Sequence, residues 1–178
     1  MIGSLVTVPA RERPDLLSPS VAAAVSAPGT PEMYVAEIDP ALADTAAFCE
    51  RYDVDLDVSA NCVVVAGRRG GETRFAACVV LATTRADVNG VVRRRLDARK
   101  ASFAPMDDAV ALTGMEYGGI TPLGLPGDWL LLVDAAVAAT PVVVVGSGVR
   151  RSKLVLPGAA LGTLPGAEVV DGLASPVA

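Results

Sequence analysis

The sequence contains no histidine, which removes the commonest general base and the commonest protein ligand for metals. Its three cysteines, Cys49, Cys62 and Cys78, are odd in number and have no CxxC spacing, so neither a disulfide framework nor a zinc site is indicated. Buried, reduced thiols are the favoured interpretation. We therefore expect no metal and no cofactor.

Aromatic residues are scarce, and long uninterrupted apolar runs are lacking. The chain is 52% hydrophobic but only 4% aromatic, so its core must be built mainly from Val, Ala and Leu. The apolar stretch at 129–145 is broken by Asp134 and Pro141 and falls short of the roughly 20 apolar residues that a membrane span needs. No basic-then-apolar leader opens the chain. These features predict a soluble, cytoplasmic protein without a membrane partner.

The net charge of -5 is unevenly distributed. Residues 1–60 carry three Arg against ten acidic residues, whereas residues 61–178 carry twelve basic residues against ten acidic ones. The basic residues of the second part are clustered, at 68–69, 93–100 and 150–153. Such clusters indicate either a local phosphate-binding surface or simply solvated faces of helices and turns.

The chain of 178 residues is long enough for one core. Residues 1–31 are rich in Pro, Ser and Ala and are interpreted as an N-terminal arm, and residues 32–178 as a single domain. The pattern predicts strands at 33–38, 61–66, 74–81, 130–133, 142–145 and 152–156, and helices at 20–26, 40–52, 87–99 and 105–114. Strands and helices are mixed without strict alternation, which indicates the α/β (mixed α+β) class.

Turn and capping residues support several of these boundaries. Asp39 followed by Pro40 is typical of a helix start, and Asp87 is a second capping candidate. Gly70 and Gly71 separate two β-branched runs and predict a hairpin. Gly114 is expected to end the helix that begins after Pro105.

The segment from Thr113 to Gly124 holds four glycines and a proline in twelve residues. Gly118 and Gly119 have no Cβ atoms, so a ligand can approach their backbone N–H groups, and Pro122 fixes the exit of the loop. These features are typical of a binding loop. Tyr117 and Met115 beside it either line a pocket or pack the loop against the core.

Three segments together resemble the YbaK family of aminoacyl-tRNA editing domains, also called the Cys-tRNA(Pro) deacylase or prolyl-tRNA-synthetase-associated editing family. The loop at 113–124 is similar to the family's Thr-Gly...Gly-Gly-x-Ser/Thr-Pro-x-Gly signature. The segment 144–150 is similar to its strand and glycine turn, and the hairpin at 59–81 is the third element. The three elements occur in the family's order, and the resemblance covers roughly residues 33–171.

The resemblance implies an α/β domain in which a curved mixed β-sheet, flanked by helices, forms a pocket for the 3′-terminal aminoacyl-adenosine of tRNA. Members of the family hydrolyse the ester of mischarged tRNA. Gly118 and Gly119 would form the pocket wall, and their amides would bind the aminoacyl ester or its ribose. The implied partners are aminoacylated tRNA and an aminoacyl-tRNA synthetase.

The sequence departs from the family at two positions. A substrate-binding lysine usually opens the first hairpin strand, where this chain has Asn61 followed by Cys62. An aspartate after the glycine turn is replaced by Lys153. We hypothesise that Lys153 takes the place of the missing ammonium group, so Asn61, Gly118 and Lys153 are the candidate catalytic residues. The alternatives are that Asn61 satisfies a strand edge and that Lys153 is solvated.

The remaining candidates are assigned to substrate and tRNA binding. The candidate substrate-binding residues are Cys62, Gly119, Thr121, Pro122, Ser147 and Gly148. Because no histidine can activate the Thr121 or Ser147 hydroxyl, these two receive hydrogen-bonding roles at most. The candidate tRNA-binding residues are Arg93, Arg94, Arg95, Arg150 and Arg151.

Two functions from different classes remain. The first is a freestanding trans-editing aminoacyl-tRNA deacylase. The second is a binding module that has lost catalysis with the family lysine and binds aminoacyl-tRNA, a nucleotide or a protein. A purely structural α/β protein is less favoured because it leaves the glycine loop without a role.

Overall fold

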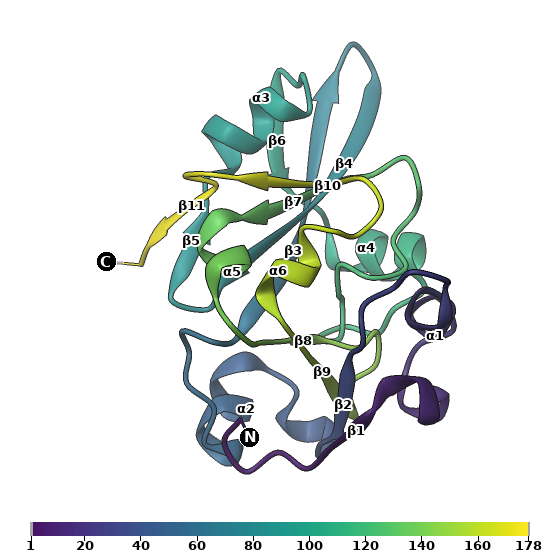
Figure 1. Ribbon diagram of the computed structural model, residues 1–178. Coiled ribbons are helices and arrows are strands. Elements are labelled where there is room, and N and C mark those ends of the chain that lie inside the picture. The colour runs from purple at the N-terminus through teal and green to yellow at the C-terminus, as the bar shows by residue number, and fades with distance from the viewer. Residues whose placement is uncertain (1, 178) are drawn as a thin grey trace.

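The computed structural model describes residues 2–177, which form strands arranged in three sheets with helices around them (Figure 1). The strands are β1 (Thr7–Pro9), β2 (Tyr34–Glu37), β3 (Ala60–Arg69), β4 (Glu72–Leu81), β5 (Thr84–Ala86), β6 (Lys100–Phe103), β7 (Leu130–Asp134), β8 (Val143–Gly146), β9 (Ser152–Leu156), β10 (Ala167–Val170) and β11 (Ala174–Pro176). The α-helices are α1 (Pro19–Ser26), α2 (Thr45–Tyr52), α3 (Arg93–Arg95), α4 (Met106–Thr113), α5 (Ala135–Ala139) and α6 (Gly158–Leu161).

Two sheets carry most of the structure. One has the antiparallel order β1-β2-β9-β8, and the other has the order β10-β7-β4-β3-β6. The second sheet is mixed, because β7 lies parallel to β4 and β10 whereas β3 lies antiparallel to β4 and β6. A parallel bridge between Ser59 and Val144 joins the two sheets at the start of β3. The predicted α/β class with a mixed sheet is confirmed.

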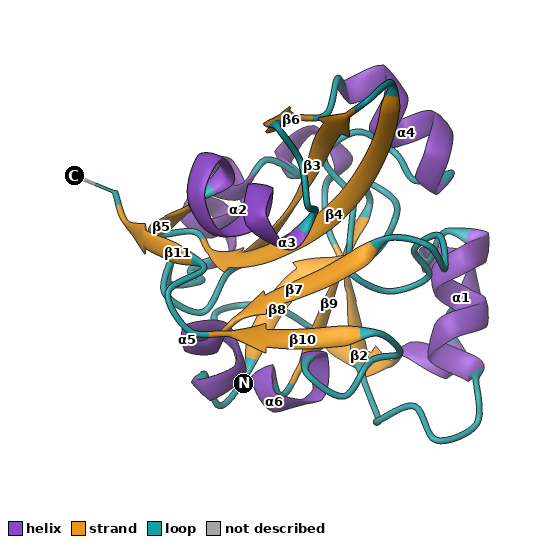
Figure 2. Ribbon diagram, turned by 90° about the horizontal axis from the view of Figure 1, so that it is seen from above, coloured by secondary structure: helices purple, strands orange, loops and turns teal. Residues whose placement is uncertain are grey.

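The hairpin predicted around Gly70 and Gly71 is present and longer than expected. β3 and β4 pair over ten residues each, from Ala60 opposite Leu81 to Arg69 opposite Glu72. Both turn glycines have positive φ, +57° and +84°, which glycine adopts without steric cost. This hairpin forms the long curved ribbon seen in Figure 2.

The helix predicted at 40–52 is wrong as one continuous element. A 3-10 turn spans Pro40–Leu42, and a separate helix, α2, begins after Asp44. The Asp39 carboxylate accepts a hydrogen bond from the Ala41 N–H, so it caps the short turn only. The break leaves the Ala43 carbonyl oxygen outside a helical ladder, where it accepts a hydrogen bond from Lys153.

The helix predicted at 87–99 is also wrong in extent. Asp87 does cap it, but a π-helical turn at Val88–Val92 is followed by only one α-helical turn, α3. Gly90 weakens the helix, and Asp97 adopts a left-handed φ of +49° that ends it. The following residues form the unpredicted edge strand β6, because pairing with β3 satisfies their backbone.

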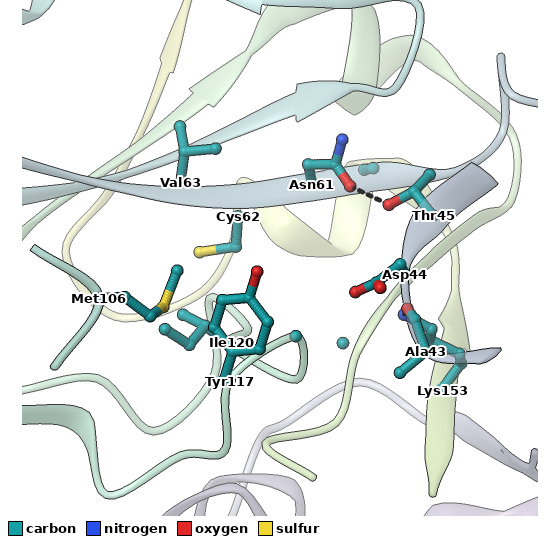
Figure 3. A pocket seen from close by; sticks show the side chains of 13 residues that line it. Ala43, Asp44, Thr45, Asn61, Cys62, Val63, Met106, Tyr117, Ile120 and Lys153 are labelled. Atoms are coloured by element: carbon teal, nitrogen blue, oxygen red, sulfur yellow. Dashed lines mark hydrogen bonds between the residues drawn. The ribbon is translucent and has the colours of Figure 1, made fainter. Parts of the chain in front are cut away.

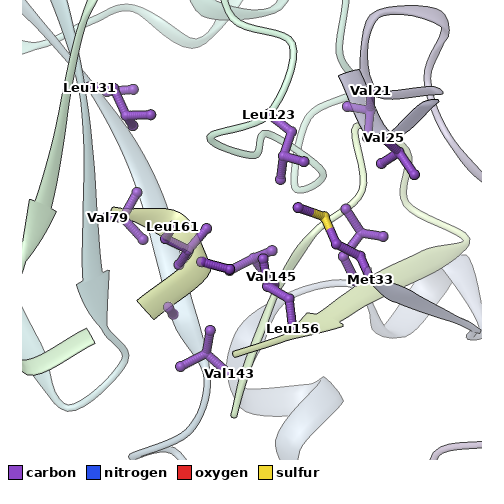
Figure 4. Packing of buried hydrophobic residues seen from close by; sticks show 14 of the residues in the cluster. Val21, Val25, Met33, Val79, Leu123, Leu131, Val143, Val145, Leu156 and Leu161 are labelled. Atoms are coloured by element: carbon purple, nitrogen blue, oxygen red, sulfur yellow. The ribbon is translucent and has the colours of Figure 1, made fainter. Parts of the chain in front are cut away.

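Residues 2–31 pack against the rest of the described chain. β1 pairs with β2, and α1 contributes Val21 and Val25 to the main core. Figure 4 shows these two side chains facing Met33 and Leu123 within the cluster that lies between the two large sheets. The division into an arm and a domain at residue 31 stays a prediction. Within residues 2–177, none of the helices combines the length and the hydropathy that crossing a membrane requires.

Candidate functional site

A cavity of about 250 Å³ opens where the two large sheets meet (Figure 3). The N-terminus of α2 forms one wall, the first residues of β3 form the second, and the glycine loop forms the third. Its lining residues are Ala43, Asp44, Thr45, Ala60, Asn61, Cys62, Val63, Met106, Tyr117, Gly118, Ile120, Gly146 and Lys153. The structure therefore brings the three predicted catalytic residues, Asn61, Gly118 and Lys153, to one cavity.

The glycine loop has a backbone that requires glycine at two positions. Gly118 has a φ of +78°, and a Cβ atom there would lie 2.4 Å from Nη1 of Arg150. A Cβ atom on Gly119 would lie 2.8 Å from the backbone of Val149. The loop can thus rest against the turn after β8 only because both residues lack side chains.

The backbone amides of Gly118 and Gly119 differ in their hydrogen bonds. The Gly119 N–H donates to the Glu116 carbonyl at 2.9 Å, and the Gly119 carbonyl accepts from the Gly148 N–H at 2.7 Å. The Gly118 N–H has no hydrogen-bond partner among residues 2–177. Only one of the two amides expected to bind substrate is therefore open, while Gly119 and Gly148 hold the loop in place.

Arg150 ties the glycine loop to the opposite wall of the cavity. Its guanidinium donates to the Tyr117 carbonyl oxygen and to the Pro40 carbonyl oxygen, each at 3.1 Å. It also lies 3.7 Å from the Asp44 carboxylate and 5.9 Å from the centre of the Tyr117 ring. These internal contacts occupy a side chain that was predicted to contact tRNA phosphates.

Asn61 and Cys62 lie on opposite sides of β3. The Asn61 Oδ1 atom accepts a hydrogen bond of 2.7 Å from the Thr45 hydroxyl. Figure 3 shows the Cys62 side chain directed toward Tyr117 and Met106, while Asn61 points to the other side of the strand. Asn61 therefore connects the strand to the start of α2. Burial raises the pKa of the Cys62 thiol far above its usual value, so this thiol stays protonated at neutral pH.

Lys153 is buried rather than solvated, with 8% of its surface exposed. Its Nζ atom donates to the Ala43 carbonyl oxygen at 2.8 Å and lies 5.1 Å from the centre of the Phe48 ring. Burial lowers the pKa of Lys153 from 10.5 to about 8, and the nearby Asp44 carboxylate opposes part of this effect. One ammonium group is thus present at the base of the α2 wall.

Of the six predicted substrate-binding residues only Cys62 lines the cavity; Gly119 and Gly148 hold the glycine loop, and Thr121, Pro122 and Ser147 also lie outside the lining. Thr121 is fully buried, and Pro122 lines a separate apolar hollow that also includes Trp129. The Ser147 hydroxyl is hydrogen-bonded to the Ser152 carbonyl and to the Ser152 hydroxyl. Ser147 therefore holds the turn between β8 and β9.

The predicted tRNA-binding arginines are dispersed and partly engaged. Arg95 forms an ion pair with Glu168, and Arg151 donates to the Asp15 carbonyl oxygen. Arg93 donates to the carbonyl oxygen of Asn89 on its own helix, and Arg94 is exposed. Of the five, only Arg150 lies beside the cavity.

Sequence reasoning missed Asp44 and Thr45. Both line the cavity, and the Asp44 side chain is 67% exposed. An Asp-Thr pair directly before an apolar helical segment is a helix-start signal that could have identified them. The more prominent Asp39–Pro40 pair predicts an earlier start, at residue 40.

The fold and the site define a small α/β domain with an open cleft beside a glycine loop. The family model of the aminoacyl-tRNA editing domain matches residues 39–164, and the chain belongs to this family. This match confirms the resemblance to the family and the predicted enzyme class, aminoacyl-tRNA deacylase. The same sequence matches no curated protein at a significant level.

Solved structures support the same fold. A candidate trans-editing enzyme for prolyl-tRNA synthetase is similar with a TM-score of 0.72 and 22% identity, covering 87% of this chain and 97% of that one. A scaffold protein from computational epitope grafting has a TM-score of 0.72 and 24% identity, with the same coverage. A hypothetical protein has a TM-score of 0.69 and 21% identity, covering 79% of this chain and 90% of that chain.

Proposed function

We propose that the chain is a trans-editing aminoacyl-tRNA deacylase, and the observation that carries this proposal is the open Gly118 N–H at the wall of the cavity. The family match supports an aminoacyl ester as the substrate class. In the reaction, water attacks the ester carbonyl carbon, the bond to the ribose oxygen breaks, and that oxygen takes the proton that the water gives up. The products are a free amino acid and tRNA.

The Gly118 N–H is proposed to donate to the carbonyl oxygen of the ester as negative charge develops on it. A preorganised donor of this kind is typically worth about 10²-fold to 10³-fold in rate. The protein needs no nucleophile of its own, because an aminoacyl ester is already activated and the neighbouring ribose hydroxyl can assist the water. This fits a cavity whose one thiol, on Cys62, is held protonated.

Asp44 is proposed to bind the α-ammonium group of the aminoacyl ester. Its carboxylate faces the cavity in Figure 3, and within residues 2–177 its one ion-pair contact, with Arg150, is long at 3.7 Å. The Lys153 ammonium group can donate further hydrogen bonds besides the one to the Ala43 carbonyl oxygen. Through that bond it holds the segment before α2, which carries Asp44, in position. Asn61 is proposed to act by holding Thr45 rather than by touching the ester.

The alternative is a binding module without turnover. It is favoured by Asn61, since an asparagine amide cannot supply the positive charge of the lysine that the family usually has there. Such a module would bind aminoacyl-tRNA, a nucleotide or a protein partner at the same cavity. The two functions differ in whether the ester is lost.

The test compares ester half-lives of alanyl-, cysteinyl- and seryl-tRNA with wild-type protein, Gly118→Ala and Gly172→Ala. Gly172 is the matched control because its φ of +72° imposes the same backbone strain, about 1–2 kcal/mol, with no atom near a new Cβ. We expect faster hydrolysis with the wild type and the control. Alanine at position 118 keeps its N–H, but its Cβ atom would lie 2.4 Å from Nη1 of Arg150 and must shift the amide, so we expect a loss of about 10²-fold with Gly118→Ala. Binding of tRNA without acceleration for any of the three would support the module instead.

A further inference from the structure

A second hollow, distant from the cavity, is lined by basic side chains. It has a volume of about 560 Å³ and lies between the end of β3, strand β6 and the helical turn at 88–95. Its lining residues are Ala66, Arg68, Asn89, Arg93, Arg99, Lys100, Ala101 and Ser102. We define the basic groove by its four cations, Arg68, Arg93, Arg99 and Lys100.

No acidic side chain in the described part of the chain neutralises the cations of the basic groove. Arg68 and Lys100 are directly opposite one another in the β3–β6 pairing, an arrangement of like charges that destabilises a sheet. The acids nearby are engaged elsewhere, since Asp97 pairs with Arg69 and Glu72 lies 3.5 Å from Arg74. Within residues 2–177 the four groove cations form no ion pair. In a chain of net charge -5, this concentration of uncompensated positive charge favours the binding of an external polyanion.

The groove lies on the same strand as the cavity. Cys62 points into the cavity, and Arg68 is six residues further along β3, so both side chains face the same side of the sheet. Six residues of strand span about 20 Å. Nucleic acid carries one phosphate per about 3.4 Å along each strand, so this distance corresponds to about six stacked nucleotides. Figure 1 shows β6 and α3 beside the hairpin, at the end of the molecule opposite α2.

We propose that the basic groove binds the phosphate backbone of the tRNA acceptor end, about six nucleotides from the 3′-terminal adenosine held in the cavity. This inference rests on the proposed function for the identity of the RNA. The exposed positions of Arg68, Arg99 and Lys100 suit a backbone that passes along the surface rather than a small enclosed anion. The contacts carry no base information and set the register of the tRNA on the protein.

The test uses Arg68→Gln/Lys100→Gln, with Arg51→Gln/Arg85→Gln as the matched control. The control removes the same two positive charges from exposed positions outside the groove. Binding of uncharged tRNA is measured at several salt concentrations. We expect the log–log salt slope to fall by about 1.5 in the groove variant, since each phosphate contact contributes about 0.7 to 0.9. Equal slopes for the groove variant and the control would overturn the proposal, as would a larger loss of polyglutamate binding than of tRNA binding.

Two substrates separate a failure of the groove from a failure of the deacylase. For aminoacyl-tRNA we expect the groove variant to raise KM about 10-fold with little change in kcat. For the small ester aminoacyl-adenosine, which cannot reach the groove, we expect kcat/KM within about twofold of wild type. A wild type that hydrolyses neither substrate would contradict the proposed function, while the salt slope would still test the groove. If the double variant fails to fold, Arg99→Gln alone is expected to lower the slope by about 0.8.

Discussion

At the scale of single residues, Lys153 links the site to the stability of the fold. Its pKa is lowered to about 8 by burial, whereas an exposed lysine in the unfolded chain keeps a pKa near 10.5. Below about pH 8 the Lys153 amine is protonated in both the folded and the unfolded protein, so the free-energy cost of burying its charge is fully present. Between pH 8 and 10.5 the unfolded state binds more protons, so the stability of the folded state rises with pH.

Replacing this side chain should remove that pH dependence. We expect the unfolding free energy of wild type relative to Lys153→Met to increase by about 2 kcal/mol between pH 7 and pH 9.5. The variant also loses the hydrogen bond to the Ala43 carbonyl oxygen. This loss changes the wild-type-to-variant difference by about 1 kcal/mol at pH 7 and at pH 9.5 alike. Urea unfolding at the two pH values measures the difference. A wild-type-to-variant difference that stays constant with pH would contradict the burial of a charged amine.

At the scale of elements, the cavity depends on how the glycine loop and the turn after β8 are held together. Arg150 reaches from that turn to Tyr117 in the loop and to Pro40 before α2. Because one guanidinium serves both carbonyl oxygens, a lysine with its single ammonium group cannot reproduce the geometry. Arg150 therefore links two walls of the cavity, beside the backbone bond between Gly119 and Gly148 and the bond from Lys153 to Ala43.

We expect Arg150→Met to lower kcat/KM for aminoacyl-tRNA about 10-fold to 100-fold, and Arg150→Lys to restore little of it. The change should also expose the 113–124 loop to limited proteolysis. Arg85→Met is the control, since Arg85 is exposed and forms no hydrogen bond through its side chain within residues 2–177. A folded Arg150→Met protein with wild-type kcat/KM and an unchanged cleavage pattern would show that Arg150 does not hold the two walls of the cavity in position.

The elements also show which parts of the structure local sequence could predict. The hairpin and α4 were predicted because Gly70, Gly71 and Gly114 mark turns and helix ends through their own φ preferences. The helix predicted at 87–99 was wrong in extent because Asp97 turns the chain and the residues from Arg99 onward pair with β3, whose partner residues lie more than 30 positions earlier. Tertiary pairing of this kind leaves no signal in local periodicity.

The candidate site was predictable to the same extent. The glycine loop carries a family signature, and Asn61 and Lys153 followed from it by position. Asp44 and Thr45 were not found, because they enter the cavity through a break between two helices that sequence reasoning had joined. The open Gly118 amide and the closed Gly119 amide could be distinguished only from the hydrogen bonds of the folded loop.

At the scale of the whole molecule, residues 2–31 complete the core that supports the cavity. Leu16, Leu17, Val21 and Val25 are each at most 6% exposed and belong to the cluster that contains Met33 and Val145. Burying four such side chains contributes about 6 to 12 kcal/mol, at about 1.5–3 kcal/mol each. A domain of this size is stable by only about 5–15 kcal/mol in total. The N-terminal segment therefore contributes energy on the scale of the whole folding free energy.

Removing residues 2–31 should accordingly abolish cooperative folding, and the loss should be traceable to the buried positions alone. We expect Val21→Ala, at a fully buried position, to lower the unfolding free energy by about 2 kcal/mol. Val6→Ala, at a position 83% exposed, should change it by less than about 0.5 kcal/mol. Denaturant unfolding of the three proteins measures these effects. A truncated chain that unfolds cooperatively near the wild-type midpoint would show that the domain folds without this segment, and would place the domain boundary at residue 31.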